Sequence, residues 1–532
     1  MVDRRTTLEV TLAPHPGSAA MPRWKIGELV DAPRFTRRNW FALLGPGLLM
    51  GGASIGGGEW LLGPVVTAKY GGALMWLATL SIVGQVFYNI EISRYTLYTG
   101  EPIFTGKFRT LPGPHVWLTV YLLLDFGSVF PYLASNAATP LAAIYLGRVP
   151  GEADSTLQRG LGSAVFLLAM LPMIFGGKIY DTLKKIMTVK VVVVLGYLLM
   201  LAVCFSTWDT WREILGGFLQ FGSVPIKGGN TGATANVFGM LARGEGLPTV
   251  DFSMIATLAG FAAIAGSGGL TNVSISGYTR DSGWGMGYHV GAIPSMVGGK
   301  HLALSHVGMV FPVTPEALVR WRGWIKHVVR DQVAVWMPAC FLGIALPSML
   351  SIQFLPRGTE AKDWSAAAMT AGGVSQAVRE AVGPLLGSAA WYATILCGFL
   401  VLGPSVASTA DGVIRRWVDV FWTSSPRLQA MAPDRIRYVF FFAVLAYATF
   451  GIIALSLGNP MQLVKIATTI MNFALGFSCW HTLAVNNILL PKELRPNYFM
   501  RAALLLSGCF FLALATITAA KEVPIFLRSI GA

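Results

Sequence analysis

Long runs of apolar residues, separated by short polar segments, follow one another along the chain from about residue 41 onward. A helix rises 1.5 Å per residue, so about 20 apolar residues cross the hydrocarbon core of a membrane. The pattern predicts an all-α integral membrane protein with about eleven transmembrane helices. The predicted spans, of which the fourth is short, cover approximately residues 41–68, 73–97, 114–146, 160–176, 185–206, 254–279, 330–353, 387–412, 438–457, 461–489 and 498–520.

Two of the predicted spans contain glycine-rich breaks. The first reads GPGLLMGGASIGGGEW from Gly45 to Trp60, and the sixth contains AGSGGLTN from Ala265 to Asn272. Because glycine loses the most chain entropy in a helix, both stretches are expected to interrupt it. Freed backbone groups are tolerated at membrane depth only where they face protein or a water-filled cavity. Paired breaks in the two halves of a chain indicate the substrate site of a secondary transporter.

The positions of the breaks also predict the domain organisation. Breaks in the first and sixth spans favour the LeuT-type fold, a five-plus-five inverted repeat followed here by one extra helix. The first repeat would cover about 41–206, the second about 254–489, and the extra helix about 498–520. Residues 1–39 have no apolar core and are expected to form a disordered cytoplasmic tail, which leaves 40–532 as one transmembrane domain.

Composition and charge support this assignment and exclude other classes. The chain of 532 residues is 54% hydrophobic and only 12% charged, whereas a soluble protein carries about 25% charge. The net charge of +14 arises from Lys and Arg in alternate loops, which predicts a cytoplasmic N-terminus in a bacterial inner membrane and not a nucleic-acid partner. The sequence has no nucleotide-binding loop, HExxH motif or CxxC pair, so neither an enzyme nor a bound cofactor is expected.

Glu59, a carboxylate at membrane depth, is the strongest candidate for a functional residue. Such groups are costly in lipid and usually pair or line a pathway, which favours a cation ligand or proton carrier. The alternative is a structural carboxylate that pairs with a lysine or caps the half-helix that follows. The second break would add carbonyl and hydroxyl oxygens that suit a hard cation, and a half-helix N-terminus that suits the carboxylate of a solute. The alternative is that its small residues only allow close helix packing. The expected substrate-binding residues are Gly56, Gly57, Gly58, Glu59, Gly266, Gly268, Gly269, Thr271 and Asn272, with Glu59 as the metal ligand.

Other charged residues within the spans have two interpretations each. Asp125 could carry a coupled proton or form an internal salt bridge. Lys190, Lys465 and Asp411 present the same alternatives. Glu91 and Arg94 are three residues apart and predict a surface ion pair. His481, alone on an apolar face, predicts a hydrogen-bonded core histidine.

Several short motifs resemble the NRAMP family of divalent-metal transporters. They are Gly45-Pro46-Gly47 with Gly58-x-Trp60, then Arg94 followed by Thr99-Gly100, and more weakly Gly403, Ser405, Ser408 and Thr409. The resemblance implies eleven or twelve helices in the LeuT-type fold and proton-coupled uptake of manganese or iron. In that fold, hydroxyls such as those of Ser405, Ser408 and Thr409 hold a coupling sodium ion together with carbonyls of the first helix.

The metal-binding motifs of that family are not retained. Where the family has Asp-Pro-Gly-Asn in the first helix, this chain has Gly56-Gly57-Gly58-Glu59. Where it has Met-Pro-His-Asn in the sixth, this chain has Gly269-Leu270-Thr271-Asn272. A thioether ligand favours transition metals, so its loss argues against manganese or iron.

Two hypotheses therefore follow, and a non-transporting receptor or scaffold is the less favoured third class. The first is a proton-coupled secondary transporter of a hard divalent cation such as Mg²⁺. The second is a sodium- or proton-coupled symporter of a small organic solute. Membrane lipid and the transported ion or solute are the expected partners, and a monomer suffices for either activity.

Overall fold

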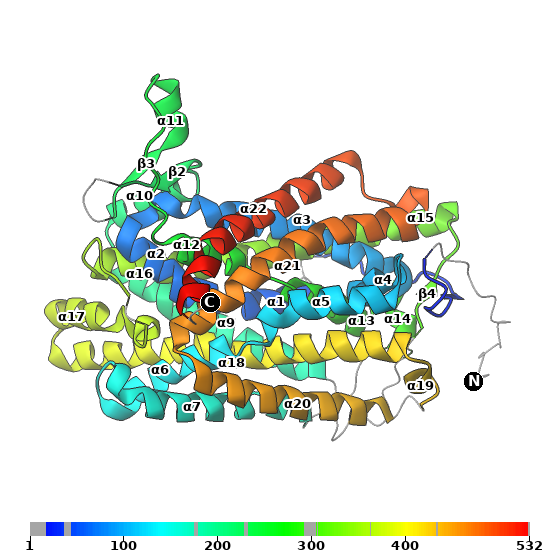
Figure 1. Ribbon diagram of the computed structural model, residues 1–532, viewed down its shortest axis with the longest axis horizontal. Coiled ribbons are helices and arrows are strands. Elements are labelled where there is room, and N and C mark those ends of the chain that lie inside the picture. The colour runs from blue at the N-terminus through cyan, green and yellow to red at the C-terminus, as the bar shows by residue number, and fades with distance from the viewer. Residues whose placement is uncertain are drawn as a thin grey trace.

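The computed structural model describes residues 17–36, 44–174, 179–227, 232–291, 305, 307–361, 363–431 and 435–529. Its long helices run side by side along the longest axis of the molecule (Figure 1). In the described residues, eight helical stretches are long and apolar enough to cross a membrane, and a pair bent by 95°, Pro46–Leu74 with Trp76–Thr99, adds a ninth. The eight are Pro114–Leu146, Glu152–Ile174, Asp181–Phe205, Pro315–Phe354, Pro384–Ser424, Tyr438–Ser456, Pro460–Leu489 and Tyr498–Glu522.

Within the described ranges the secondary structure is mainly helical, with four short strands. The helices are α1 Pro46–Ser54, α2 Gly63–Tyr70, α3 Trp76–Thr99, α4 Ile103–Arg109, α5 Pro114–Val129, α6 Tyr132–Leu146, α7 Ser155–Leu168, α8 Leu171–Ile174, α9 Ile179–Phe205, α10 Trp208–Gly217, α11 Val237–Ala242, α12 Ile255–Ile264, α13 Ser274–Asp281, α14 Gly287–Val290, α15 Pro315–Asp331, α16 Met337–Phe354, α17 Ala371–Val382, α18 Pro384–Ser424, α19 Pro426–Gln429, α20 Ile436–Leu457, α21 Pro460–Leu489 and α22 Tyr498–Ser529. The strands are β1 Lys25–Ile26, β2 Ser223–Pro225, β3 Thr234–Asn236 and β4 Met309–Val310.

The first predicted break is present. Helix α1 ends at Ser54, and a π-helical turn over Gly58–Leu62 then leads into α2. A Cβ atom at Gly58 would lie 2.3 Å from the carbonyl oxygen of Ile264, the last residue of α12. Only glycine permits this approach, so the break in the first span packs directly against the start of the break in the sixth.

The second predicted break is also present. Helix α12 ends at Ile264, and α13 begins at Ser274 after a 3₁₀ turn over Thr271–Val273. Three glycines of the break, Gly266, Gly268 and Gly269, have φ angles of 105°, 69° and 57°. Other residues rarely adopt these angles, so the glycines account for the shape of the break.

The N-terminal segment corrects one expectation. Residues 17–36 are not disordered, because β1 pairs in parallel with β4 and the side chain of Trp24 is buried. The Trp24 indole N–H donates a hydrogen bond to Glu101, in the loop between α3 and α4. Residues 1–16 and 37–39 of the expected tail lie outside the described residues.

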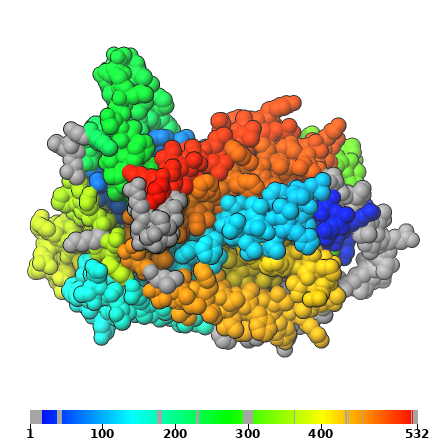
Figure 2. All heavy atoms as spheres, in the orientation of Figure 1, coloured from blue at the N-terminus to red at the C-terminus, as the bar shows by residue number. Residues whose placement is uncertain are grey.

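One segment stands apart from the helical bundle. Strands β2 and β3 pair as an antiparallel hairpin that continues into α11. This segment projects sideways from one end of the molecule, as the green finger of both views shows (Figures 1 and 2). It belongs to the long Gly-rich connection between α10 and α12.

Candidate functional site

The two breaks enclose a small cavity of about 20 Å³. A site of roughly 10–15 Å³ already holds one water molecule, so this volume suits a water or a single ion. The cavity is lined by Ala53, Ser54, Gly56, Gly57, Gly58, Glu59, Tyr132, Leu133, Ile264, Gly266, Ser267, Thr271 and Thr409. Backbone, hydroxyl and carboxylate groups of both broken spans therefore meet there.

The Glu59 carboxylate joins the two breaks. One oxygen accepts a hydrogen bond from the backbone N–H of Gly56 at 3.0 Å, and the other from the N–H of Gly266 at 3.2 Å. The side chain has no exposed surface. Ser54 and Ser267 add a hydroxyl–hydroxyl contact of 2.8 Å between the same two spans. These bonds satisfy donors that the broken helices would otherwise leave free.

Only some of the predicted substrate-binding residues line the cavity. Gly56, Gly57, Gly58, Glu59, Gly266 and Thr271 line it, whereas Gly268, Gly269 and Asn272 do not. A Cβ at Gly268 would meet the backbone of Ala263, and one at Gly269 would meet Met471. The Asn272 amide donates to Asn89 on α3 at 2.8 Å. These three residues shape the break and anchor it.

Gln85 on α3 is a site-forming residue that sequence reasoning missed. Its amide nitrogen donates to the carbonyl of Ala265, and its oxygen accepts from the N–H groups of Ser267 and Gly268. One buried side chain thus holds the open backbone of the second break. The available signal was a glutamine inside an apolar span, since such a group needs partners in lipid.

The predicted sodium site contains the side-chain amine of a lysine. Lys190 on α9 donates a hydrogen bond to the hydroxyl of Ser405 on α18 at 2.5 Å. The Ser405 hydroxyl also lies 3.2 Å from the carbonyl oxygen of Ala53 in α1. The serine and the first-helix carbonyl expected to bind sodium are therefore close together, but with a lysine amine beside them. Thr409 lines the cavity between the breaks, and Ser408 donates to the carbonyl of Ser405.

Asp125, expected as a proton carrier, forms an internal ion pair, the alternative that its sequence also allowed. Its carboxylate accepts two hydrogen bonds from the guanidinium of Arg416, at 2.7 and 2.5 Å. The Trp417 indole N–H donates a third at 2.7 Å. Asp125 does not line the cavity between the breaks. Every hydrogen bond described for it stabilises the packing of α5 on α18.

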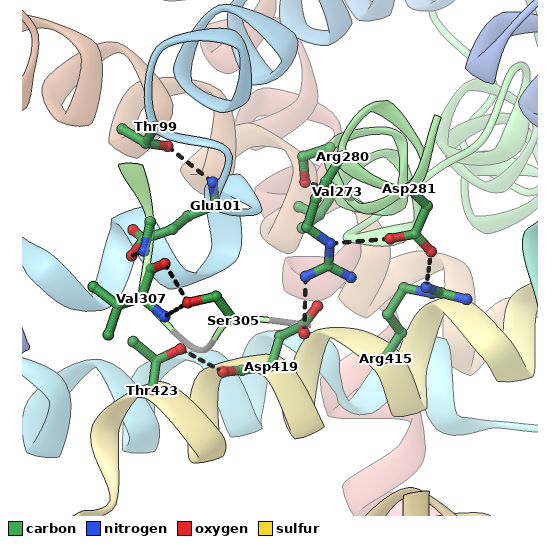
Figure 3. Close-up of polar contacts among 12 residues, drawn as sticks. Thr99, Glu101, Val273, Arg280, Asp281, Ser305, Val307, Arg415, Asp419 and Thr423 are labelled. Atoms are coloured by element: carbon green, nitrogen blue, oxygen red, sulfur yellow. Dashed lines mark hydrogen bonds and ion pairs between the residues drawn. The ribbon is translucent and has the colours of Figure 1, made fainter. Parts of the chain in front are cut away.

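A buried charge network fixes α13 to α18 (Figure 3). Arg280 contacts Asp281 and Asp419, both at 3.0 Å, and Arg415 bridges Asp281 to Asp411. Asp411 also accepts from the hydroxyl of Tyr278. The second half of the broken sixth span is thus held to the long helix α18 at its end away from the break.

Three further predictions have direct outcomes. Glu91 and Arg94 do pair, at 2.8 Å, but the pair is buried and not on the surface, because Asn486 of α21 covers the carboxylate. His481 is a hydrogen-bonded core histidine, as predicted, with Thr110 and Tyr121 as partners. Lys465 lines a separate cavity with Lys69, away from the breaks.

The candidate site is an oxygen site with a single carboxylate. In the described part of the chain, no three His, Cys, Asp or Glu side chains are grouped closely enough to hold a metal together. Mg²⁺ is commonly bound through one or two carboxylates plus water, and carboxylate, carbonyl and water oxygens are in general the ligands of hard divalent ions. The donor set therefore suits a hard ion.

A solved transporter structure shares this fold. The Eremococcus coleocola manganese transporter matches with a TM-score of 0.58 and 11% identity over 94% of this chain and 90% of that chain. Mhp1, of the nucleobase-cation-symport-1 family, matches with a TM-score of 0.47 and 11% identity over 91% of each chain. MhsT in complex with L-phenylalanine matches with a TM-score of 0.44 and 14% identity over 90% of this chain and 98% of that chain. No family model and no curated protein sequence matches the chain. The chain has the fold of the manganese transporter, as its sequence motifs implied.

Proposed function

We propose that the protein is a secondary active transporter that carries a small hard cation, Mg²⁺ or a similar divalent ion, by alternating access. The observation that carries the proposal is the cavity of about 20 Å³ between the two breaks. It offers one carboxylate and several neutral oxygens, the ligands that a hard cation prefers. Its volume suits an ion, whereas sites for organic ligands typically enclose about 300–1,000 Å³.

Glu59 would change partners when the ion binds. In the structure it accepts hydrogen bonds from Gly56 and Gly266. A cation in the cavity would attract the same carboxylate oxygens and release these backbone donors. Because the donors belong to two different spans, ion binding would alter how the breaks are held together. This is the kind of differential interaction that a conformational change requires.

Lys190 favours coupling to protons instead of sodium. Its amine donates a hydrogen bond to Ser405, the serine that was expected to bind sodium. A cation bound at Glu59 would repel a proton held by Lys190 and favour its loss. Cation binding and proton release would then be linked, which is the requirement for coupled transport.

The membrane placement belongs to the same proposal. Basic residues in alternate loops favour an N-terminus in the cytoplasm, and we assign the protein to a bacterial inner membrane. A single chain contains both breaks and the cavity between them, so a monomer without a cofactor would suffice.

Ion uptake into liposomes tests the proposal. Purified protein would be reconstituted with an entrapped Mg²⁺-sensitive dye, and uptake recorded with and without a pH gradient. Glu59→Gln keeps the size of the side chain but removes its charge, and Glu380→Gln on the exposed surface of α17 is the matched control. We expect Mg²⁺ uptake by wild type and Glu380→Gln, and none by Glu59→Gln.

The absence of divalent-ion uptake by active wild-type protein would contradict the cation assignment. Uptake that is unchanged in Glu59→Gln would contradict the role of that residue. A pH gradient driven by an organic solute in the same liposomes would support the second hypothesis, a solute symporter.

A further inference from the structure

A second cavity, of about 480 Å³, lies away from the two breaks. It is bounded by the C-terminal end of α3, one face of α15 and the 3₁₀ turn Lys492–Leu494 before α22. The residues that line it are Arg94, Leu318, Trp321, Arg322, Ile325, Lys326 and Glu493. Its volume is that of a small-molecule site, yet the proposed transport function makes no use of it.

Basic side chains dominate the polar lining. Arg94 is buried, and its guanidinium already binds Glu91 and the carbonyl oxygen of Leu494. Arg322 and Lys326 are exposed and lie four residues apart, so both extend from the same side of α15. Glu493 is the one acid among the lining residues. The cavity therefore has an excess of positive charge.

The remaining wall is apolar. Leu318, Trp321 and Ile325 are spaced three and four residues apart, which places them on one face of α15. Trp321 is buried, and the other two are half-buried. A site with cations on one side and an indole with two aliphatic chains on the other suits an amphiphilic anion better than a fully hydrated one.

Neighbouring aromatic residues favour a position of the cavity near the membrane surface. Phe87 of α3 contacts Phe499, at the start of α22, with 5.5 Å between the ring centres. Phe499 and the adjacent Tyr498 are 66% and 86% exposed, as aromatic residues at the lipid–water boundary are. Arg94 lies seven residues beyond Phe87, or about 10 Å further along α3. That distance corresponds to the head-group layer.

We propose that this cavity binds the phosphate head group of an anionic phospholipid from the adjacent leaflet. Arg322 and Lys326, with Arg94 behind them, would pair with the phosphate, while Trp321 and Ile325 contact the glycerol and upper acyl chains. Basic pockets at helix ends are established binding sites for such head groups. The site is separate from the ion cavity, so either proposal can fail without the other.

Lipid titration of the purified full-length protein tests this site. Thermal unfolding would be followed in neutral detergent with added phosphatidylglycerol, phosphatidylcholine or inorganic phosphate. The variant is Arg322→Ala/Lys326→Ala, and the control is Lys185→Ala/Arg427→Ala, which removes the same charge from exposed positions outside the cavity. All four side chains are exposed, so both variants are expected to fold.

We expect phosphatidylglycerol to raise the unfolding temperature saturably in wild type and control, with an apparent affinity on the order of tenfold weaker in Arg322→Ala/Lys326→Ala. Phosphatidylcholine should give no saturable rise. Equal phosphatidylglycerol affinity in the two double variants would overturn the site. Stabilisation by inorganic phosphate alone, matching that of phosphatidylglycerol, would overturn its assignment to a lipid.

Discussion

Glu59 accepts a hydrogen bond from the backbone N–H of Gly266 across 3.2 Å, although 207 residues separate the two along the chain. The same carboxylate accepts a second bond from Gly56. One buried acid thus satisfies backbone donors of both broken spans. Any ion that draws this carboxylate into the cavity must loosen the connection between the spans, so the site and the moving parts of a transporter would share one residue.

Replacing Gly58 by alanine should separate the two breaks. The new Cβ would meet the Ile264 carbonyl oxygen at 2.3 Å, and backbone cannot yield as a flexible side chain would. We expect a loss of about 1–3 kcal/mol of stability, seen as a lower unfolding temperature in detergent. Gly196→Ala in α9 is the control, because its new methyl group would have no atom of another element within 4 Å. Equal unfolding temperatures for the two variants would contradict the packing role of Gly58.

Lys190 and Glu59 should be energetically coupled. Removing one of the two charges leaves the other buried without an opposite charge, whereas removing both leaves no buried charge. A double-mutant cycle with Lys190→Met and Glu59→Gln should therefore give a coupling free energy of about 0.5–3 kcal/mol in thermal unfolding. Lys185→Met, an exposed position on the same helix, should show no coupling to Glu59→Gln. Strictly additive effects for the Lys190 pair would argue against charge coupling at the site.

Asp125→Asn should act on stability and leave the ion site intact. The substitution leaves the buried guanidinium of Arg416 without its anion, which costs about 3–5 kcal/mol. If Asp125 is structural, the surviving folded protein should still bind Mg²⁺ with unchanged affinity, measured by calorimetry. A stable Asp125→Asn protein that loses pH-driven uptake would instead restore Asp125 as the proton carrier.

The fold and the breaks were predictable because their signals are local. Span length, apolar runs and clustered glycines are properties of neighbouring residues, and all appear in the structure. The partners of Lys190 and Asp125 were not predictable, since Ser405 and Arg416 lie 215 and 291 residues away. A single sequence does not show which residues far apart along the chain come into contact. Hence each charge had two interpretations that only the packing of α5 and α9 against α18 could separate.

The folded N-terminal segment was missed for a related reason. Its composition resembles that of a disordered tail, but Trp24 gains burial and a hydrogen bond to Glu101 through pairing of β1 with β4. Two-residue strands have no recognisable periodicity, so the pairing leaves no trace in the sequence.

Acid should weaken the contact between this segment and the helices. Burial disfavours the charged carboxylate, but the Arg109 guanidinium at 2.5 Å and the Trp24 N–H outweigh it and hold the pKa of Glu101 below its ordinary value. Because this pKa is lower in the folded than in the unfolded protein, the charged carboxylate stabilises the fold when the pH is above the unfolded-state pKa of about 4.3. This stabilisation is lost as the pH falls through the folded-state pKa.

The unfolding temperature of wild type should therefore fall more steeply below about pH 4.3 than that of Glu101→Gln. Glu245→Gln removes an acid whose pKa is lowered by an exposed arginine, Arg243, and should follow wild type. Parallel curves for wild type and Glu101→Gln would show that this carboxylate does not stabilise the fold.

Ligand-dependent thermal stabilisation tests the central assignment most directly. Purified wild type, Glu59→Gln and the surface control Glu380→Gln would be heated in detergent with Mg²⁺, Ca²⁺, Mn²⁺ or Na⁺. An ion that binds only the folded protein adds about 2.7 kcal/mol at a hundredfold excess over its Kd. We predict a saturable shift with Mg²⁺ or another divalent ion in wild type and Glu380→Gln that is absent in Glu59→Gln. No divalent shift in wild type, or one that survives in Glu59→Gln, would contradict a cation site at Glu59.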